Sequence, residues 1–260
     1  MSGPGRIADA FAASGKRAAL MPYLMGGFPD LPASRAVGEA CVDAGADLLE
    51  LGVPYSDPLA DGPVIHAAGS AALRAGATLA GVLEVGAALA PRIPVVLMCY
   101  ANLVHARGPE RFAAALAERG LAGLIVPDLP LEEAGELRAA CDAAGVALVP
   151  LVAPTTPPER LARIGAAARG FLYTVSVMGT TGERAALDGL SDLLTRARAA
   201  AEVPVAVGFG IGTPDAARQA ADAGAEGVIV GSRLVRAAGE GPDPAAAVAA
   251  VVARMAAALR

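Results

Sequence analysis

Short apolar runs recur at regular intervals along the chain, each followed by a turn rich in Gly, Pro or Asp and then by an Ala-rich stretch. This alternation is typical of repeated strand and helix units, in which the strands form a parallel sheet. Eight such runs predict strands at residues 18–25, 47–53, 94–99, 122–126, 146–152, 170–175, 203–207 and 226–230. Eight strands that alternate with helices predict an α/β fold, a closed (β/α)8 TIM barrel.

The stretches between the strands have apolar residues three and four positions apart and a Gly where a helix should end, as in residues 31–45, 108–120 and 130–145. These stretches predict the outer helices. Residues 5–16 predict an extra N-terminal helix that closes the bottom of the barrel. A short helix over residues 233–238 follows the last strand, and no linker divides the chain, so we expect residues 1–260 to form a single barrel domain.

The composition agrees with an α/β barrel, because 260 residues is an ordinary length for one barrel. Hydrophobic residues make up 55% of the chain, aromatic residues only 3%, and Trp is absent. The core must therefore consist of Ala, Val, Leu and Ile. No apolar run reaches the length of about 18 residues that a membrane span needs, and the first residues lack the apolar stretch of a signal peptide. We therefore expect a soluble, cytoplasmic protein without a membrane partner.

Charge and residue counts exclude several classes of function. The three cysteines, Cys41, Cys99 and Cys141, are odd in number and lack C-x-x-C spacing, which argues against a disulfide framework or a zinc site. A net charge of −5 makes nucleic acid a poor partner. His66 and His105 are the only histidines, so we expect no metal centre and assign acid/base chemistry to carboxylates or tyrosines.

Function in such a barrel lies at the C-terminal ends of the strands. Glu50 lies there among apolar neighbours in the run DLLELGV. A carboxylate is costly to bury without a partner, so we expect its pKa to be raised and Glu50 to be a general acid/base candidate. The alternative is an ion pair that fills the barrel interior, but the only basic residue near the predicted strands is Arg17.

The loop over residues 52–63 contains Asp57 and Asp61 among Pro and Gly, where each alone would be an ordinary turn former. Three tyrosines lie at or near strand ends, and each alone would more often be a core residue than a substrate contact. These are Tyr23, Tyr100 and Tyr173.

Gly-rich segments follow the last three predicted strands, at residues 178–182, 207–213 and 230–235. Each glycine alone is an ordinary turn residue. Together, their backbone N–H groups and the start of the short helix near Ser232 predict a phosphate site. A phosphorylated small substrate follows, although several isomerases and lyases share this feature.

The string ELGVPYSDPLADGP, residues 50–63, closely resembles the signature of tryptophan synthase α chains. Further segments agree in order, including PYLMGGFPD, VVLMCYANLV, GLIVPDLPLEEA and LYTVSVMGTTG, so the resemblance covers essentially the full chain. It implies cleavage of indole-3-glycerol phosphate to indole and glyceraldehyde 3-phosphate. It also implies a β-subunit partner in an α2β2 heterotetramer. Pyridoxal phosphate belongs to that partner, and no cofactor is expected in this chain.

The resemblance further implies roles for individual residues. Glu50 is the acid and base, Asp61 binds the indole N–H, and Tyr173 lies beside Glu50. Four residues are expected around the indole: Tyr23, Tyr100, Ile125 and Phe209. Five are expected around the phosphate: Thr181, Gly182, Gly210, Gly231 and Ser232. Tyr23 stands where some relatives have Phe, and the loop over residues 178–187 varies among them.

The loops after the second, third and fourth strands share the rim of the barrel with the site, so we expect them to form the β-subunit face. Their candidate residues are Asp57, Asn102, Asp128 and Pro130. Three alternatives remain open at this point: a stand-alone lyase that releases indole, a non-catalytic partner subunit that only binds the ligand, and another phosphate-binding barrel such as a sugar-phosphate isomerase.

Overall fold

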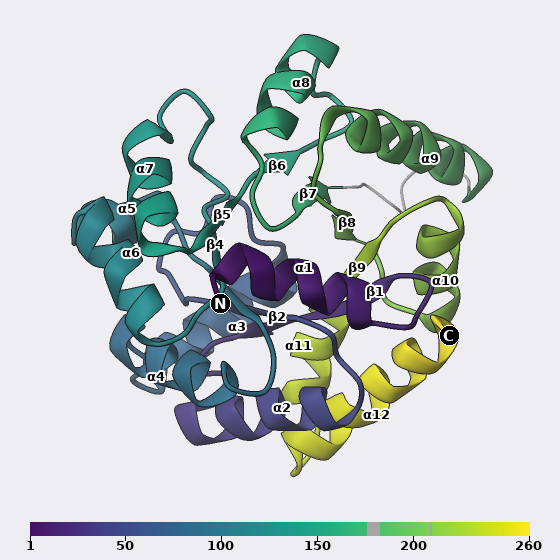
Figure 1. Ribbon diagram of the computed structural model, residues 1–260. Helices are drawn as coiled ribbons and strands as arrows, with labels where there is room; N and C mark the ends of the chain where they lie inside the picture. Colours follow the sequence, from purple (N-terminus) through teal and green to yellow (C-terminus); the bar gives the residue numbers. More distant parts are fainter. Residues whose placement is uncertain (176–182, 209) are drawn as a thin grey trace.

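The computed structural model describes residues 1–175, 183–208 and 210–260, with only the backbone described over 183–188. These residues contain nine parallel strands in the order β5-β4-β3-β2-β1-β9-β8-β7-β6, with helices around them (Figure 1). The strands are β1 Ala19–Met25, β2 Leu49–Gly52, β3 Val95–Met98, β4 Gly123–Ile125, β5 Ala147–Val149, β6 Leu151–Val152, β7 Leu172–Val175, β8 Val205–Gly208 and β9 Gly227–Val230.

The barrel closes through a segment that a single proline divides. Pro150 separates β5, which pairs with β4, from β6, which pairs with β7. Proline has no N–H to donate to the ladder, so the regular pairing is interrupted there. The Pro150 carbonyl still accepts the Tyr173 N–H at 3.0 Å. Residues 147–152 therefore act as one strand, and the predicted eight-strand TIM barrel is confirmed.

The helices lie in the regions where the sequence predicts them, with added elements after β2 and β3. They are α1 Gly3–Ala13, α2 Leu31–Asp43, α3 Pro63–Arg74, α4 Leu79–Leu89, α5 Ala101–His105, α6 Pro109–Glu118, α7 Gly135–Ala144, α8 Pro158–Ala167, α9 Glu183–Ala200, α10 Pro214–Asp222, α11 Ser232–Ala238 and α12 Pro244–Ala258. The start of α7 differs from the predicted stretch, because the N–H groups of Glu133 and Ala134 form turns with the carbonyls of Pro130 and Leu131.

No single helix in the described part of the chain is long and apolar enough to cross a membrane. Helices α3 and α4 satisfy the length and hydropathy criteria only jointly, across a bend of 107°.

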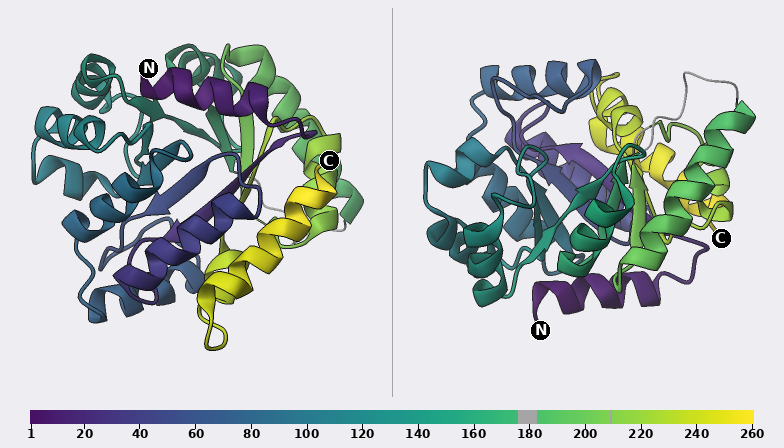
Figure 2. Two further views of the ribbon diagram at one scale, coloured as in Figure 1. Left: turned by 60° about the horizontal axis from the view of Figure 1, so that its bottom comes forward. Right: turned by 90° about the horizontal axis from the view of Figure 1, so that it is seen from above.

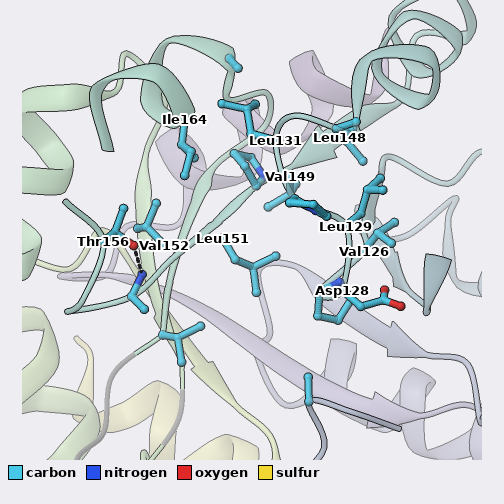
Figure 3. A pocket seen from close by; sticks show the side chains of 18 of the residues that line it. Val126, Asp128, Leu129, Leu131, Leu148, Val149, Leu151, Val152, Thr156 and Ile164 are labelled. Atoms are coloured by element: carbon cyan, nitrogen blue, oxygen red, sulfur yellow. Dashed lines mark hydrogen bonds between the residues drawn. The ribbon is translucent and has the colours of Figure 1, made fainter. Parts of the chain in front are cut away.

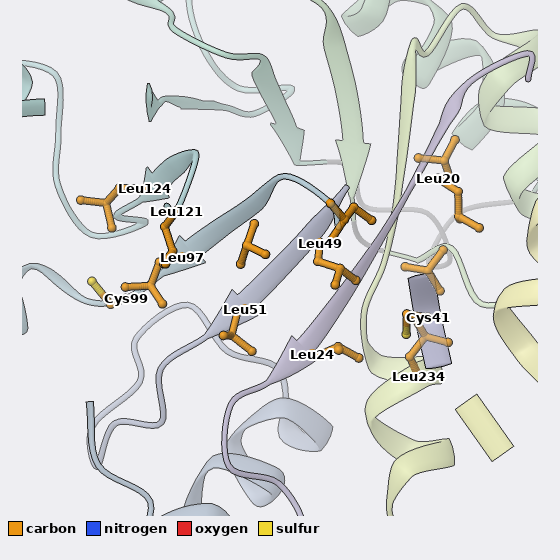
Figure 4. Packing of buried hydrophobic residues seen from close by; sticks show 14 of the residues in the cluster. Leu20, Leu24, Cys41, Leu49, Leu51, Leu97, Cys99, Leu121, Leu124 and Leu234 are labelled. Atoms are coloured by element: carbon orange, nitrogen blue, oxygen red, sulfur yellow. The ribbon is translucent and has the colours of Figure 1, made fainter. Parts of the chain in front are cut away.

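Side chains alternate between two buried layers along each strand. Outward residues such as Leu20, Leu49 and Leu97 pack under the helices in the larger core (Figure 4). Inward residues such as Met21 and Val96 fill the barrel. Because both faces are buried, the strands have continuous apolar sequences, and a polar residue among them is conspicuous.

Helix α1 covers the end of the barrel opposite the C-terminal strand ends (Figures 1 and 2). The Gly3 N–H donates to the Gly145 carbonyl at 2.7 Å, and a Cβ on Gly3 would lie 2.0 Å from a backbone oxygen. Ile7 is fully buried among the inward residues, and the ring of Phe11 lies 6.1 Å from that of Phe171. The N-terminal helix therefore closes the barrel bottom, as the sequence predicts.

Replacing Arg6 by Ala should destabilise this closure. The guanidinium donates to the carbonyls of Gly120 at 2.6 Å, Ile93 at 3.3 Å and Ala90. Hydrogen bonds to a charged group are worth about 1.5–3 kcal/mol each and are not additive, so we expect a loss of about 2–3 kcal/mol in the free energy of unfolding. Urea unfolding measures it. Arg35→Ala, which removes an exposed ion pair with Glu39, is the control and should cost under about 1 kcal/mol. A similar small loss for Arg6→Ala would contradict the anchoring role.

Candidate active site

Glu50 is a buried carboxyl group without a partner. Its side chain lies on β2 in the barrel interior and is 0% exposed, and neither carboxyl oxygen has a hydrogen-bond partner among the described residues. Burial raises its pKa from 4.5 to about 8. The expected raised pKa is therefore present, and no ion pair to Glu50 occurs in the described part of the chain. A carboxyl group of this kind can give and recover a proton near neutral pH.

Two tyrosines direct their side chains into the same interior. Tyr23 on β1 pairs in register with Glu50, and Tyr173 lies on β7. Each hydroxyl lies where a glycine leaves room: a Cβ on Gly52 would be 2.1 Å from the Tyr23 oxygen, and one on Gly208 would be 2.2 Å from the Tyr173 oxygen. Burial raises the pKa of both phenols, and the charge of Glu50 adds to the effect. Both tyrosines therefore stay protonated, and neither hydroxyl group is hydrogen-bonded to Glu50.

The loop after β2 brings Asp61 to the mouth of the barrel. The Tyr100 hydroxyl donates to Asp61 Oδ1 at 3.0 Å and accepts the Ala60 N–H at 3.0 Å. Partial burial raises the pKa of Asp61, while the Tyr100 hydrogen bond and the charge of His66 oppose that rise. A defined hydrogen bond thus holds the half-buried aspartate at this position.

Side-chain contacts connect the loops after β2, β3 and β4. The Tyr55 ring lies 5.4 Å from the Tyr100 ring, and Asn102 Nδ2 donates to the Tyr55 hydroxyl at 3.2 Å. Asp128 accepts the Ala101 N–H at 2.9 Å. The predicted interface residues Asp57, Asn102 and Pro130 are exposed, and Asp128 is half-buried. Asp57, Asp128 and Pro130 lie on loops at the C-terminal rim of the barrel, and Asn102 lies in α5, which follows β3.

A cavity of about 580 Å³ opens at this rim (Figure 3). Its wall combines the ends of strands with α7 and α8, and it includes Met98, Leu151 and Val175. The sequence reasoning missed these three residues. Strand alternation would have found them, since each lies two positions after an inward residue: Val96, Val149 or Tyr173.

The buried acid and the residues expected around it do not line this cavity: its wall includes none of Glu50, Asp61, Tyr23, Tyr100, Ile125 and Tyr173. Ile125 is 0% exposed and is not among the residues that line the cavity. Tyr100 contacts Asp61 and is likewise absent from the cavity wall. Ile125 is the last residue of β4 and belongs to the inward cluster, and Tyr100 follows the end of β3. Phe209, Thr181 and Gly182 lie outside the described residues.

The described part of the expected phosphate site lies at the ends of β8 and β9. Gly210 is exposed and has a φ of 79°, a conformation that favours glycine. Gly231 precedes α11, Ser232 is its first residue, and no side chain caps this helix start. Its first backbone N–H groups are therefore not covered by a side-chain cap. No group of His, Cys, Asp and Glu that could hold a metal ion occurs within the described ranges.

The fold and the site together define a class: a (β/α)8-barrel enzyme in which a buried acid, a second carboxylate and an uncapped helix start meet at the C-terminal ends of the strands. The family profile described as tryptophan synthase alpha chain matches residues 10–259. The chain belongs to this family, and its activity is the family's lyase reaction.

Individual relatives agree with this assignment. The tryptophan synthase alpha chain of Prochlorococcus marinus (strain MIT 9313) is 53% identical over 223 residues, which is 85% of this chain and 81% of the relative. A solved tryptophan synthase of Mycobacterium tuberculosis matches with a TM-score of 0.89 and 41% identity, over 99% of this chain and 98% of that one. The tryptophan synthase a2b2 complex of Pyrococcus furiosus matches with a TM-score of 0.86 and 36% identity, over 92% of this chain and 98% of that one.

Proposed function

We propose that Glu50 carries both proton transfers in the cleavage of indole-3-glycerol phosphate to indole and glyceraldehyde 3-phosphate. The supporting observation is its buried, unpartnered carboxyl group with a pKa of about 8. The protonated acid gives its proton to indole C3, and the resulting carboxylate removes the proton of the neighbouring glycerol hydroxyl. The bond between C3 and the glycerol carbon then breaks, its electron pair returns to the ring, and the hydroxyl carbon becomes the aldehyde. Glu50 ends protonated, so no net proton is consumed.

Asp61 stabilises the intermediate of this reaction in our proposal. Protonation at C3 places positive charge on the indole nitrogen, and a fixed carboxylate close to that nitrogen lowers the energy of the charged state. Tyr100 supports this role because it donates to one oxygen of Asp61 and leaves the other oxygen for the indole N–H. Tyr173 bounds the other side of Glu50.

The remaining parts of the substrate have matching surroundings. We assign the indole ring to the surroundings of Tyr23, Tyr100, Ile125 and Phe209. Met98, Leu151 and Val175 of the cavity wall pack against the same interior cluster as Tyr23 and Ile125. We assign the phosphate to the backbone N–H groups of Gly210, Gly231 and Ser232, together with Thr181 and Gly182, because an uncapped helix start favours an anion. No step in this scheme requires a metal or an organic cofactor. Pyridoxal phosphate is assigned to a partner β subunit.

We propose that the chain works in the cytoplasm as the α subunit of an α2β2 complex. The rim loops support this assembly, since hydrogen bonds and ring contacts already join the loops after β2, β3 and β4. A protein docked there can fix the Asp61 loop and exclude water from the site. The structure of the Pyrococcus furiosus complex is itself described in terms of mutual activation.

The assembly predicts that a β subunit stimulates indole release and that Asp57→Ala weakens this stimulation. By thermodynamic reciprocity, a glycerol-phosphate analogue must tighten subunit association by the same factor by which association tightens binding of the analogue. Indole release with and without a β subunit, together with calorimetric titration, measures both effects. Asp243→Ala, an exposed N-cap of α12, is the control substitution and should leave stimulation unchanged. Full stimulation of Asp57→Ala together with unchanged association would favour a stand-alone lyase.

A further inference from the structure

The Tyr23 side chain on β1 lies between Gly52 on β2 and Gly231, which directly follows β9; β2 and β9 are the two strands that flank β1. On one side, a Cβ on Gly231 would lie 3.6 Å from Tyr23 Cβ and Cδ1. On the other side, a Cβ on Gly52 would lie 2.1 Å from the hydroxyl oxygen, 2.7 Å from Cζ and 3.0 Å from Cε2. The ring therefore extends from the end of β9 toward β2, and only a glycine at position 52 leaves room for the hydroxyl group.

This position places the hydroxyl group on the mouth side of the Glu50 carboxyl group. Glu50 and Gly52 are two residues apart on β2, so they face the same interior and their Cα atoms are about 6.6 Å apart along the strand. A glutamate side chain spans a large part of that distance. Tyr23 is 7% exposed and Glu50 is 0% exposed, so the small opening to solvent lies on the tyrosine.

Few polar groups face Glu50 within the described residues. The inward positions of β3, β4, β8 and β9 next to it are apolar: Val96, Ile125, Ala206 and Ile229. Tyr23 on β1 and Tyr173 on β7 are the titratable groups that face it from other strands, with Asp61 and Tyr100 beyond Tyr23. The pKa of Tyr23 is raised by burial and by the charges of both Asp61 and Glu50.

We propose that Tyr23 is a positioning residue for Glu50, in addition to any contact of its ring with the indole. Its ring keeps water away from the carboxyl group. Its hydroxyl group becomes the hydrogen-bond donor to the carboxylate that exists after Glu50 has given its proton to the substrate. Tyr23 remains protonated throughout and transfers no proton. This inference rests on the proposed acid/base role of Glu50 and adds a residue that controls when the carboxylate is stable.

The two parts of the side chain have opposite effects on the acidity of Glu50. Exclusion of water by the ring disfavours the carboxylate and raises the pKa, whereas donation from the hydroxyl group favours the carboxylate and lowers the pKa. Removing the hydroxyl group alone therefore raises the pKa. Removing the ring as well should lower it, because the water that enters solvates the carboxylate more strongly than the one lost donor did. A residue that only fills space produces no such pair of opposite shifts.

Tyr23→Phe provides the first test. The proposed reaction starts from protonated Glu50, so kcat/KM falls as the pH rises through its pKa. We call this fall of kcat/KM at high pH the alkaline limb of the profile. Loss of one donor to the carboxylate should raise the pH of the limb by about one unit. We expect kcat near neutral pH to fall by about tenfold, with KM changed less than twofold, because the carboxylate intermediate loses its donor. Carbon-13 NMR of labelled glutamate, assigned by comparison with Glu50→Gln, should show the same upward shift without substrate.

Tyr23→Leu keeps an apolar side chain but is too short to reach Gly52, so it should admit water and move the limb to lower pH. Tyr55→Phe is the matched loss of a hydroxyl group at a distance from Glu50 and should leave the limb in place. An unchanged limb and an unchanged NMR titration in Tyr23→Phe would overturn the inference, whether or not Tyr23→Leu folds. A shift found only in Tyr173→Phe would also overturn it and assign the donor to Tyr173.

Glu50→Gln separates failure of this inference from failure of the proposed function. Turnover by Glu50→Gln would reject the acid/base role itself. An inactive Glu50→Gln together with an unshifted Tyr23→Phe would reject only the role of Tyr23.

Discussion

Glu50→Gln should lose cleavage of indole-3-glycerol phosphate almost completely, with an expected fall in kcat of about 10⁴-fold. General acid/base catalysis contributes about 10²–10⁴-fold, and the upper end applies because one group performs both proton transfers. The amide is nearly the same size as the acid but cannot give and recover a proton. Binding of glycerol phosphate should change less than about twofold, because the proposed phosphate donors lie at the ends of β8 and β9. Stopped-flow or coupled assays of turnover and calorimetry of ligand binding measure the two effects.

The same substitution should make the fold more stable at alkaline pH. In the unfolded chain Glu50 ionises near its ordinary pKa of 4.5, whereas in the folded chain burial raises the pKa to about 8. Between these values the unfolded state releases a proton that the folded state retains, so the free energy of unfolding falls as the pH rises. The contribution amounts to about 3 kcal/mol at pH 7 at most.

Glu50→Gln lacks this pH dependence. The difference in unfolding free energy between variant and wild type should therefore grow in favour of the variant by up to about 3 kcal/mol from pH 5 to pH 8. Urea unfolding at both pH values measures it, with Glu118→Gln on α6 as a surface control without such a trend. Normal turnover of Glu50→Gln would reject the proposed mechanism. A flat difference between the two pH values would contradict the buried, unpartnered state of the carboxyl group.

The sequence predicts the barrel well because its strands are buried on both faces. Continuous apolar runs separated by amphipathic helices leave few alternatives to a closed parallel sheet. The division of the fifth segment at Pro150 is the kind of detail that such runs obscure, since proline is apolar and interrupts the ladder without ending the strand. The late start of α7 has a similar origin, because two turns precede the helix although the residues suit either conformation.

The sequence predicts some residues of the site much better than others. Glu50 can be found from the sequence because a charged residue inside a buried strand is rare. The wall of the cavity is harder to infer, because it depends on where each strand ends and on which hydroxyl group meets which loop. Met98 and Leu151 are missed because apolar side chains carry no chemical signal. The close approach of the Tyr23 hydroxyl group to Gly52 cannot be inferred from the sequence, because it joins residues of two different strands in space.

Asp61→Asn should lower kcat by about 10²–10³-fold. This fall is smaller than the one expected for Glu50→Gln, but it is larger than the loss of the negative charge alone would cause. The Tyr100 hydroxyl accepts the Ala60 N–H, so its own proton goes to Asp61 Oδ1. A carboxylate has a second oxygen for the indole N–H, whereas an amide has only one oxygen. In the variant, either Tyr100 or the indole nitrogen therefore faces an NH2 group.

This competition predicts a specific double-mutant result. Adding Tyr100→Phe to Asp61→Asn frees the amide oxygen for the indole, so the double variant should recover about tenfold in kcat over Asp61→Asn alone. In the wild-type background Tyr100→Phe should instead reduce kcat, because it removes the hydrogen bond that holds Asp61. The sign of the Tyr100→Phe effect thus reverses with the residue at position 61, and steady-state rates of the four proteins measure it. Additive losses in the double variant would show that Tyr100 does not set the orientation of Asp61, and wild-type turnover of Asp61→Asn would reduce Asp61 to a turn residue.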